Sequence, residues 1–375
     1  MAEVIVIGGG IAGCTSAFFL AADGVDVTLL EQHELNTLAS GSNAGSLHAQ
    51  IQPEPFVELG ETWARQFLPA LPLYIEAMSL WRNIGSALDT DLEVAQEGGI
   101  VVAANDEEMR ILEAKSGLER SAGLATELLN MSELRDRAPY ISRHMVGAAF
   151  CPIEGKANPL LAASAFAAAA RSRGATIQQR HRVTAIRSSG AGYEVDTNNG
   201  SFRAARIVNA AGIEAGRVAA LLGGHVDMQS FPLQLSVTEP IHPLIGHLVY
   251  SGSEMLTLKQ TRTGTVLIGG GWPATLDDQK RPQVTSNSLH GNLRVALDVV
   301  PALASVNIVR TWAAEVNGNE SWLPVIGEMP GAKGFFINYV PWMGFSGAPA
   351  ASRIVTSLVQ GRDPPVDFDV SPFKP

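Results

Sequence analysis

The chain opens with Val4-Ile5-Val6-Ile7-Gly8-Gly9-Gly10-Ile11-Ala12-Gly13, and this stretch decides the fold. Its four apolar residues, mostly β-branched, predict a short buried strand. Gly8, Gly10 and Gly13 follow in the spacing G-x-G-x-x-G. The first glycine permits a tight turn, the second lets backbone N–H groups approach a pyrophosphate, and the third lets the next helix pack closely. We expect that helix from Ile11 to Asp23, with its N-terminal dipole directed at phosphates.

A second strand and an acidic residue at its end complete the pattern. Val25 to Leu30 predicts the strand, and Glu31 closes it. A carboxylate at this place can accept both hydroxyls of an adenosine ribose, whereas it would repel a 2′-phosphate. A glycine pattern alone also fits a structural turn in an unrelated α/β domain. Because strand, helix, second strand and acid occur in order, the sequence predicts an adenine dinucleotide, FAD or NAD rather than NADP.

Composition excludes several other classes of protein. The length of 375 residues suggests two domains, and the net charge of −10 argues against a nucleic-acid partner. Cys14 and Cys151 are the only cysteines, too few for an iron–sulfur cluster, and no metal site is expected. They are expected to be buried thiols in a reducing compartment. With no signal peptide and no stretch long enough to span a membrane, the sequence predicts a cytoplasmic protein.

The rest of the chain alternates between helical and strand patterns. The residues from Leu38 to Gln50 are small and polar and predict a loop, either one along a cofactor or a plain surface loop. Apolar residues from Trp63 to Trp81 recur at helical spacing and are expected to face a core. Asn158 and Pro159 predict the start of a helix that ends at Gly174. Further expected elements are a strand pair over Asp91 to Ala103, a helix over Asp106 to Ala122, strands over Thr176 to Arg187, Gly192 to Thr197 and Ser201 to Asn209, a β-rich region from Met228 to Asn317, a strand over Gly334 to Asn338, and a helix from Pro349 to Gly361.

Several short motifs, in this order, resemble a known superfamily. They are Gly8-x-Gly10-x-x-Gly13 with Glu31, Gly155-Lys156-Ala157-Asn158-Pro159, Ile207-Val208-Asn209-Ala210-Ala211-Gly212, Arg310-Thr311-Trp312, Leu323-Pro324-Val325-Ile326-Gly327 and Gly344-Phe345-Ser346-Gly347-Ala348-Pro349. The chain resembles the FAD-dependent amine oxidoreductases of the D-amino-acid oxidase, glycine oxidase and sarcosine oxidase superfamily. The stretches from Ser40 to His48 and from Arg310 to Ala314 are most similar to opine oxidase B subunits and D-hydroxyproline dehydrogenases.

The resemblance implies an α/β fold with an α+β second domain. A Rossmann-like FAD-binding domain would be built from the discontinuous segments 1–88, 145–226 and 320–375. A substrate domain with a mainly antiparallel sheet would comprise residues 89–144 and 227–319.

The resemblance also implies which residues bind FAD. They are Gly8, Gly10, Ile11, Ala12, Gly13, Glu31, Gln32, Ser40, Ser42, Asn43, Ala44, Gly45, Ser46, Val183, Ala210, Ala211, Gly212, Gly344, Phe345 and Ser346. The helix starting near Pro349 would direct its N-terminus at the flavin N1–C2=O, where reduced flavin is negative.

The sequence departs from the family pattern at Ile213-Glu214 and over Tyr339 to Met343. No cysteine lies in the C-terminal half, and Gly45 falls where mitochondrial relatives carry a flavin-linked histidine. Non-covalent FAD is therefore expected.

The implied reaction is oxidation of the C–N bond of an amino or imino acid, such as an opine, to an imine that hydrolyses. Arg262 or Arg310 would anchor a substrate carboxylate, Lys259 would approach the flavin, and His48 would contact substrate. Tyr339 and Trp342, with Trp322, would wall the pocket. Each residue also has a plainer interpretation: surface ion pairs for the arginines, a solvated lysine, a structural histidine and core aromatics.

Resemblance to opine oxidases implies that the chain is the catalytic member of a complex, working with A-type and small iron–sulfur partner subunits in opine catabolism. Two alternatives stay open: a stand-alone oxidase that uses O₂, and a flavin-binding subunit that supports a catalytic partner.

Overall fold

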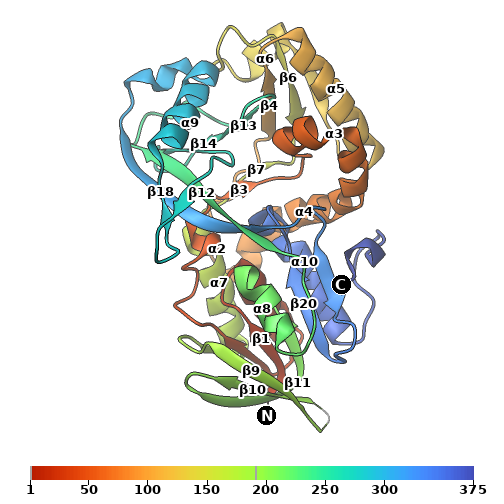
Figure 1. Ribbon diagram of the computed structural model, residues 1–375. Helices are drawn as coiled ribbons and strands as arrows, with labels where there is room; N and C mark the ends of the chain where they lie inside the picture. Colours follow the sequence, from red (N-terminus) through yellow and green to blue (C-terminus); the bar gives the residue numbers. More distant parts are fainter. Residues whose placement is uncertain (1, 191) are drawn as a thin grey trace.

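The computed structural model describes residues 2–190 and 192–375 and contains two large sheets, one in each half of an elongated molecule (Figure 1). The first sheet has the order β19-β20-β11-β1-β2-β8, and the hairpin β9-β10 joins it through β11. Its strands are β1 Ala2–Ile7, β2 Val27–Leu30, β8 Thr176–Gln178, β9 Val183–Ser189, β10 Gly192–Thr197, β11 Gly200–Asn209, β19 Val325–Glu328 and β20 Phe335–Tyr339. The helices packed on it are α1 Ile11–Ala22, α7 Pro159–Ser172, α8 Ala215–Ala220 and α10 Gly344–Val359.

Strand β1 lies inside this sheet because it is apolar on both faces. It pairs in parallel with β2 and β11, and β20 continues the parallel set next to β11. Val4 and Val6 belong to the apolar cluster under α1, α7 and α10, whereas Ile5 and Ile7 belong to the cluster that includes α8. A parallel sheet covered on both faces is the arrangement that a near-continuous apolar strand requires.

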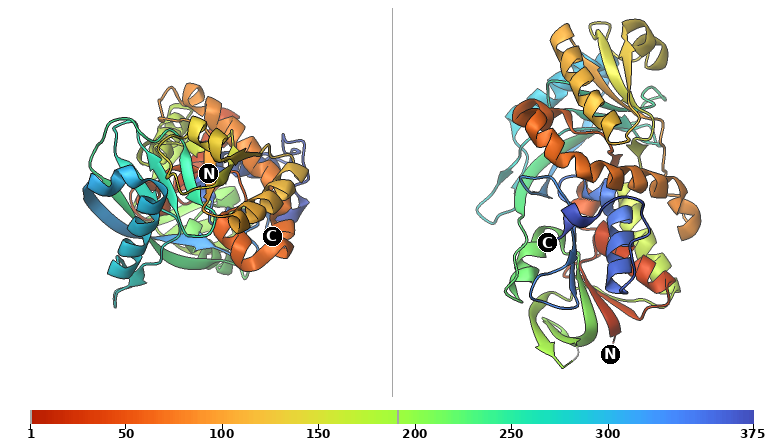
Figure 2. Two further views of the ribbon diagram at one scale, coloured as in Figure 1. Left: turned by 90° about the horizontal axis from the view of Figure 1, so that it is seen from above. Right: turned by 90° about the vertical axis from the view of Figure 1, so that its right-hand side faces the viewer.

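The second sheet, in the upper half of Figure 1, is mainly antiparallel and has the order β18-β12-β15-β14-β13-β4-β6-β5. Its strands are β4 Gly99–Ala103, β5 Glu127–Asn130, β6 Gly147–Cys151, β12 Gln229–Thr238, β13 Leu248–Ser251, β14 Thr257–Gln260, β15 Val266–Gly269 and β18 Ile308–Gly318. The helices that accompany it are α5 Asp106–Ser121, α6 Met131–Arg137 and α9 Ser286–Val299. The long strands β12 and β18 reach from this sheet toward the first one (Figures 1 and 2).

The segment between β2 and β4 connects the two halves. It contains α2 Ala39–Ser42, β3 Ser46–Leu47, α3 Pro53–Phe67, the 3₁₀ turn Leu68–Ala70 and α4 Leu71–Leu88. β3 pairs with β7 Gly155–Lys156, and β16 Thr275–Leu276 pairs with β17 Pro282–Gln283. The apolar stripe expected from Trp63 to Trp81 is buried in the core, shared between α3 and α4. The indole of Trp81 donates to the carbonyl of Ser346 at 2.9 Å, which ties α4 to α10.

Local structure differs from the sequence-based expectation in three loop and strand regions. The expected loop from Leu38 to Gln50 contains α2 and β3. The strand pair expected over Asp91 to Ala103 is a single strand, β4, preceded by one bridge between Ala95 and Lys156. The strand expected over Thr176 to Arg187 is divided into β8 and β9. These two strands join different parts of the sheet, β2 and β10 respectively.

The sequence missed one helix and misplaced the start of another. The β-rich region from Met228 to Asn317 includes helix α9, whose apolar positions pack under the second sheet. The C-terminal helix begins at Gly344, five residues before the predicted start at Pro349, which lies inside it. Pro349 lies in the second turn of α10, so it removes one N–H donor from the hydrogen-bond ladder of the helix.

The predicted domain boundaries stay a proposal. Strand β6, which the predicted division places with the first domain, pairs with β4 and β5 of the second sheet. In the residues that the structure describes, no helix is both long and apolar enough to cross a membrane.

Close packing at Gly13 generates a testable prediction. A Cβ on Gly13 would lie 1.8 Å from the carbonyl oxygen of Gly8, whereas one on Gly117 in α5 would meet nothing within 4 Å. We expect Gly13→Ala to lower the free energy of unfolding by about 3 kcal/mol, since backbone must move to admit the methyl group. Gly117→Ala is the matched control and should raise stability by up to about 1 kcal/mol. Urea denaturation measures the free energy of unfolding of both variants. Equal effects of the two substitutions would contradict a steric clash at Gly13.

Candidate functional site

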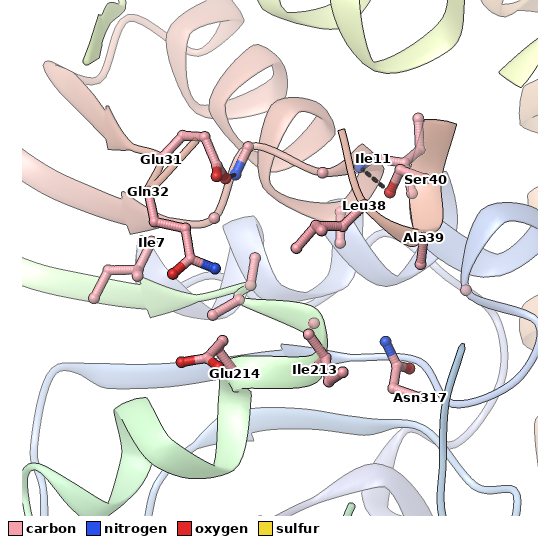
Figure 3. Close-up of a pocket in the computed structure, with 18 of the residues that line it drawn as sticks. Ile7, Ile11, Glu31, Gln32, Leu38, Ala39, Ser40, Ile213, Glu214 and Asn317 are labelled. Carbon is pink, nitrogen blue, oxygen red and sulfur yellow. Dashed lines mark hydrogen bonds between the residues drawn. The ribbon is translucent and has the colours of Figure 1, made fainter. Parts of the chain in front are cut away.

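A cavity of about 190 Å³ lies where the first sheet meets the N-terminal end of α1 (Figure 3). The turns that follow β1, β2 and β11 form its walls, together with α2 and the start of α10. Of the residues expected to bind a cofactor, it is lined by Gly8, Gly10, Ile11, Ala12, Glu31, Gln32, Ser40, Asn43, Val183, Ala210, Ala211, Gly212, Gly344 and Phe345. The carboxyl ends of parallel strands are the usual ligand-binding edge of such a sheet.

The glycines of the first turn hold this edge open. Gly8 has a φ of +112°, and a Cβ there would lie 2.4 Å from the carbonyl oxygen of Ala210. A Cβ on Gly10 would meet Ser40 Oγ at 2.9 Å. Ser40 Oγ also accepts a hydrogen bond from the backbone N–H of Ile11 at 2.9 Å (Figure 3). Gly10 precedes α1 and has no side chain to cap the helix. The hydroxyl of Ser40, in α2, therefore accepts one of the free N–H groups at the start of α1.

Glu31 lies at the end of β2 and faces the glycine turn. Its carboxylate accepts the N–H groups of Gly9 at 2.5 Å and of His33 at 2.7 Å. These bonds fix the carboxylate at the cavity wall beside Gln32, and each oxygen keeps capacity for a further donor. This is the place at which a ribose hydroxyl pair would be held.

Several lining residues were not expected to bind the cofactor. They are Leu38, Ala39, His181, Arg182, Ile213, Glu214, Arg217, Val316, Asn317 and Asn338. Ile213, Glu214 and Asn317 form the wall opposite α1 (Figure 3). Ile213-Glu214 stood out in the sequence only as a departure from the family pattern, and nothing local distinguishes Asn317 in its strand.

A second cavity, of about 600 Å³, lies beside the first and toward the second sheet. Four residues line both cavities: Asn43, Val316, Trp342 and Phe345. Of the predicted residues, Ala44, Ser46, His48 and Ser346 line the second cavity, with Trp322 in its wall. The two cavities therefore share a wall at the N-terminus of α10, where the helix dipole is positive.

His48 is held by a buried chain of hydrogen bonds. Its Nδ1 lies 2.6 Å from the hydroxyl of Tyr250, and that hydroxyl donates to Glu154 Oε2 at 3.1 Å. Glu154 also accepts the backbone N–H groups of Ala49 and Gln50 and the side-chain amide of Gln50, all within 2.8 Å. Burial raises the pKa of Glu154, and these hydrogen bonds oppose that rise. Burial, and secondarily the charge of Lys259, lowers the pKa of His48 to about 3, so His48 is neutral at pH 7.

Lys259 is buried directly behind the second cavity. Its Nζ donates to Ser46 Oγ at 2.5 Å, and Ser46 lines the cavity. Burial, and then the charge of Lys156, lowers the pKa of Lys259 to about 7. The expectation of a solvated lysine is therefore wrong, and the approach of Lys259 to the flavin stays a proposal.

The two arginines expected to anchor a carboxylate line neither cavity. Arg262 is exposed and pairs with Asp91 at 2.6 Å. Arg310 is exposed with its guanidinium 5.6 Å from the ring centre of Trp312. Both belong to surface contacts, which corrects their predicted role. Tyr339 lines the first cavity rather than the second, and its hydroxyl donates to the carbonyl of Gly318 at 3.1 Å.

Three residues predicted to bind the cofactor have structural contacts instead. Gly13 packs on Gly8, and the carbonyl of Ser42 accepts the indole N–H of Trp312 at 2.9 Å. Gly45 has a φ of +74°, and a Cβ there would lie 2.1 Å from the carbonyl oxygen of Ala157. The lining of neither cavity includes any of the three.

This fold and the glycine turn at its first cavity are typical of dinucleotide-dependent enzymes. The chain belongs to the FAD dependent oxidoreductase (DAO) family, whose model matches residues 3–358. The expected FAD-dependent amine oxidoreductase superfamily and cofactor are confirmed.

Characterised proteins of similar sequence carry out several amine oxidations. Glycine oxidase of Geobacillus kaustophilus is 27% identical over 99% of this chain and 96% of that protein. The B subunit of opine oxidase from Rhizobium meliloti is 26% identical over 83% of this chain and 80% of that protein. Among solved structures, G. kaustophilus glycine oxidase matches with a TM-score of 0.88 and 25% identity, covering 100% of this chain and 98% of that one. L-proline dehydrogenase from P. horikoshii matches with a TM-score of 0.85 and 25% identity, covering 99% of this chain and 97% of that one.

The lining of the first cavity fits FAD. The glycines let neighbouring turns approach this edge more closely than a Cβ would permit, and Glu31 is placed for a ribose. Asn338, at the sheet edge, keeps a buried Oδ1 without a partner in the described part of the chain, so a bound donor would satisfy it.

The buried ammonium of Lys259 generates a pH prediction. Because its folded-state pKa is about 7 and its unfolded value is 10.5, the unfolded chain binds more protons between these pH values. Wild-type stability, relative to Lys259→Met, should therefore rise as pH increases from about 7 to about 10 and stay constant below that window. Denaturation midpoints across pH measure this difference. Lys333→Met, at an exposed lysine, is the control and should give a flat difference.

Proposed function

We propose that the chain holds FAD non-covalently in the first cavity and oxidises the C–N bond of a secondary amine or imino acid bound in the second. The shared wall of the two cavities, made by Asn43, Val316, Trp342 and Phe345, is the observation that carries this proposal. A substrate in the second cavity can lie against a cofactor in the first only where these cavities meet. Bound FAD supplies the hydride acceptor for the C–H bond next to nitrogen.

The start of α10 stabilises negative charge at that junction. Its first turn, Gly344 to Ser346, contains no acidic residue, and Gly344 and Phe345 line the first cavity. The unpaired N–H groups of a helix N-terminus stabilise an anion placed beside them. The helix thus favours the reduced, negatively charged form of the cofactor.

His48 is the proposed hydrogen-bond acceptor for the substrate nitrogen. The single hydroxyl hydrogen of Tyr250 is donated to Glu154, so His48 Nδ1 must donate to the oxygen of Tyr250. The other ring nitrogen, Nε2, is left with a lone pair, and His48 lines the second cavity. Because the pKa of His48 is lowered to about 3, the ammonium proton of the substrate is lost to water rather than to this ring. The neutral amine then donates its N–H to Nε2 in a hydrogen bond that orients it, and loss of its C–H hydride leaves an iminium ion that water hydrolyses.

The chain is proposed to act as the catalytic member of a heteromeric dehydrogenase that passes electrons to partner proteins. Support comes from similarity to the B subunit of opine oxidase and to the beta subunit of sarcosine oxidase from Arthrobacter sp, which is 25% identical over 93% of this chain. A stand-alone oxidase is the second candidate, favoured by the match along 96% of glycine oxidase. Oxygen consumption by the isolated chain distinguishes them, because only the stand-alone oxidase reduces O₂ rapidly without partners.

The decisive experiment is an anaerobic absorbance scan of the FAD-loaded chain with glycine, sarcosine, proline, opines and simple secondary amines. We expect one class of compound to bleach the flavin band at a saturable rate. If dithionite bleaches the flavin but none of these compounds does, the result would favour a non-catalytic, flavin-binding role. A protein that binds no FAD after reconstitution would refute the proposal.

Removal of the hydrogen-bond acceptor at His48 should slow the reaction without loss of FAD. We expect His48→Asn to lower the rate of flavin reduction by up to about 100-fold, since misplacement of the reacting atoms costs up to about that much. The deficit should not change with pH, because neutral His48 takes no proton. His290→Asn, at an exposed histidine in α9, is the matched control. Flavin reduction at the wild-type rate in His48→Asn would contradict this role of His48.

A further inference from the structure

The second cavity has an unusual set of charged groups for a chamber expected to bind a carboxylate. Within the described residues, its lining includes the carboxylates of Glu54, Glu58 and Glu254 and no lysine or arginine. His48 is its remaining titratable cation, and that side chain is neutral. A cavity whose formal charges are all negative raises the local concentration of cations and repels anions.

Two of the three carboxylates lack a cationic partner. Glu254 pairs with Arg294, which also pairs with Asp298 and lies outside the lining. Glu54 and Glu58 lie one turn apart at the start of α3, and in residues 2–190 and 192–375 neither has an ion pair. Burial, and then the charge of Glu58, raises the pKa of Glu54. A cation bound beside these two carboxylates would offset their mutual repulsion.

Aromatic side chains also line the second cavity, and one of them, Trp342, lines the first cavity as well. The rings of Trp342 and Trp322 stack with centroids 4.9 Å apart, and Phe231 lies 4.4 Å from Trp342. All three are half-buried lining residues, so part of each ring faces the cavity. Aromatic faces attract ammonium groups and, unlike arginine, offer nothing to a carboxylate.

We propose that the second cavity takes a cationic alkylamine that carries no carboxylate next to the reacting carbon. Its ammonium would lie against the aromatic wall of Phe231, Trp322 and Trp342, with Glu54 and Glu58 at the entrance. This inference rests on the proposed function and narrows its substrate class. The buried Lys259 donates to Ser46 Oγ and is not among the lining residues.

Matched pairs of ligands test the proposal directly. Pyrrolidine and proline differ only by a carboxylate, as do N-methylbutylamine and N-methylnorvaline. Each is titrated by calorimetry into the FAD-loaded chain without an electron acceptor, and the flavin band is followed in parallel. We expect each amine to bind at least about tenfold more tightly than its carboxylated partner, the equivalent of about 1.4 kcal/mol.

Variants of α3 locate the source of that preference. Glu54→Gln combined with Glu58→Gln should weaken amine binding about tenfold and reduce its salt dependence. Glu61→Gln is the matched control on the same helix, because Glu61 pairs with Arg65 outside the lining. Trp342→Leu should weaken amine binding more than Trp342→Phe, which keeps an aromatic face.

The outcomes separate this inference from the proposed function. Proline that binds as tightly as pyrrolidine would overturn the inference, as would a double variant that binds amines normally or the failure of both amines to bind. Amines that bind with the expected preference and never bleach the flavin would leave the inference standing and count against the proposed oxidation of such amines.

Discussion

The close approach of two backbone turns is the constraint on which the rest of the structure depends. The turn after β1 and the turn after β11 meet at Gly8 and Ala210, where there is no room for a side chain. That contact sets β1 beside β11 and forms the edge that lines the first cavity. A side chain at Gly8 would also need a positive φ, so space and backbone conformation demand glycine together.

The second cavity depends on the same edge, although other parts of the chain form it. Strand β18 starts in the second sheet, and its far end brings Val316 and Asn317 to the first. Trp342 adopts a φ of +56° and is held by its N–H bond to the carbonyl of Asn317 and its indole bond to the carbonyl of Asn319. Such backbone strain in a tryptophan persists where neighbouring contacts determine the conformation, and these contacts come from the end of β18.

Many of the residues that the sequence assigned to a dinucleotide lie together at the first cavity, because the determinants of this edge are local. Gly8, Gly10 and Glu31 lie within one strand–helix–strand unit, so spacing alone describes their geometry. Helix α9 escaped prediction because it lies among short strands, where turns and brief apolar runs obscure its period. The hydrogen-bond chain of His48, Tyr250 and Glu154 joins three distant parts of the chain, and no spacing rule connects them. Arg262 and Arg310 were expected to anchor a substrate carboxylate because a guanidinium pairs well with one. Both side chains are exposed and contact surface partners instead, Asp91 and Trp312 respectively.

The order in which the chain is synthesised has a consequence for cofactor loading. The first sheet takes β1 and β2 from the first 30 residues, β11 from the middle and β20 from residues 335–339. Gly344 and Phe345, at the start of α10, complete the cavity. A nascent chain on the ribosome therefore holds the glycine turn long before it holds a finished binding site. With FAD in the first cavity, as proposed, the cofactor would be enclosed only after nearly the whole chain has emerged, which would make its capture a late event in the maturation of this protein.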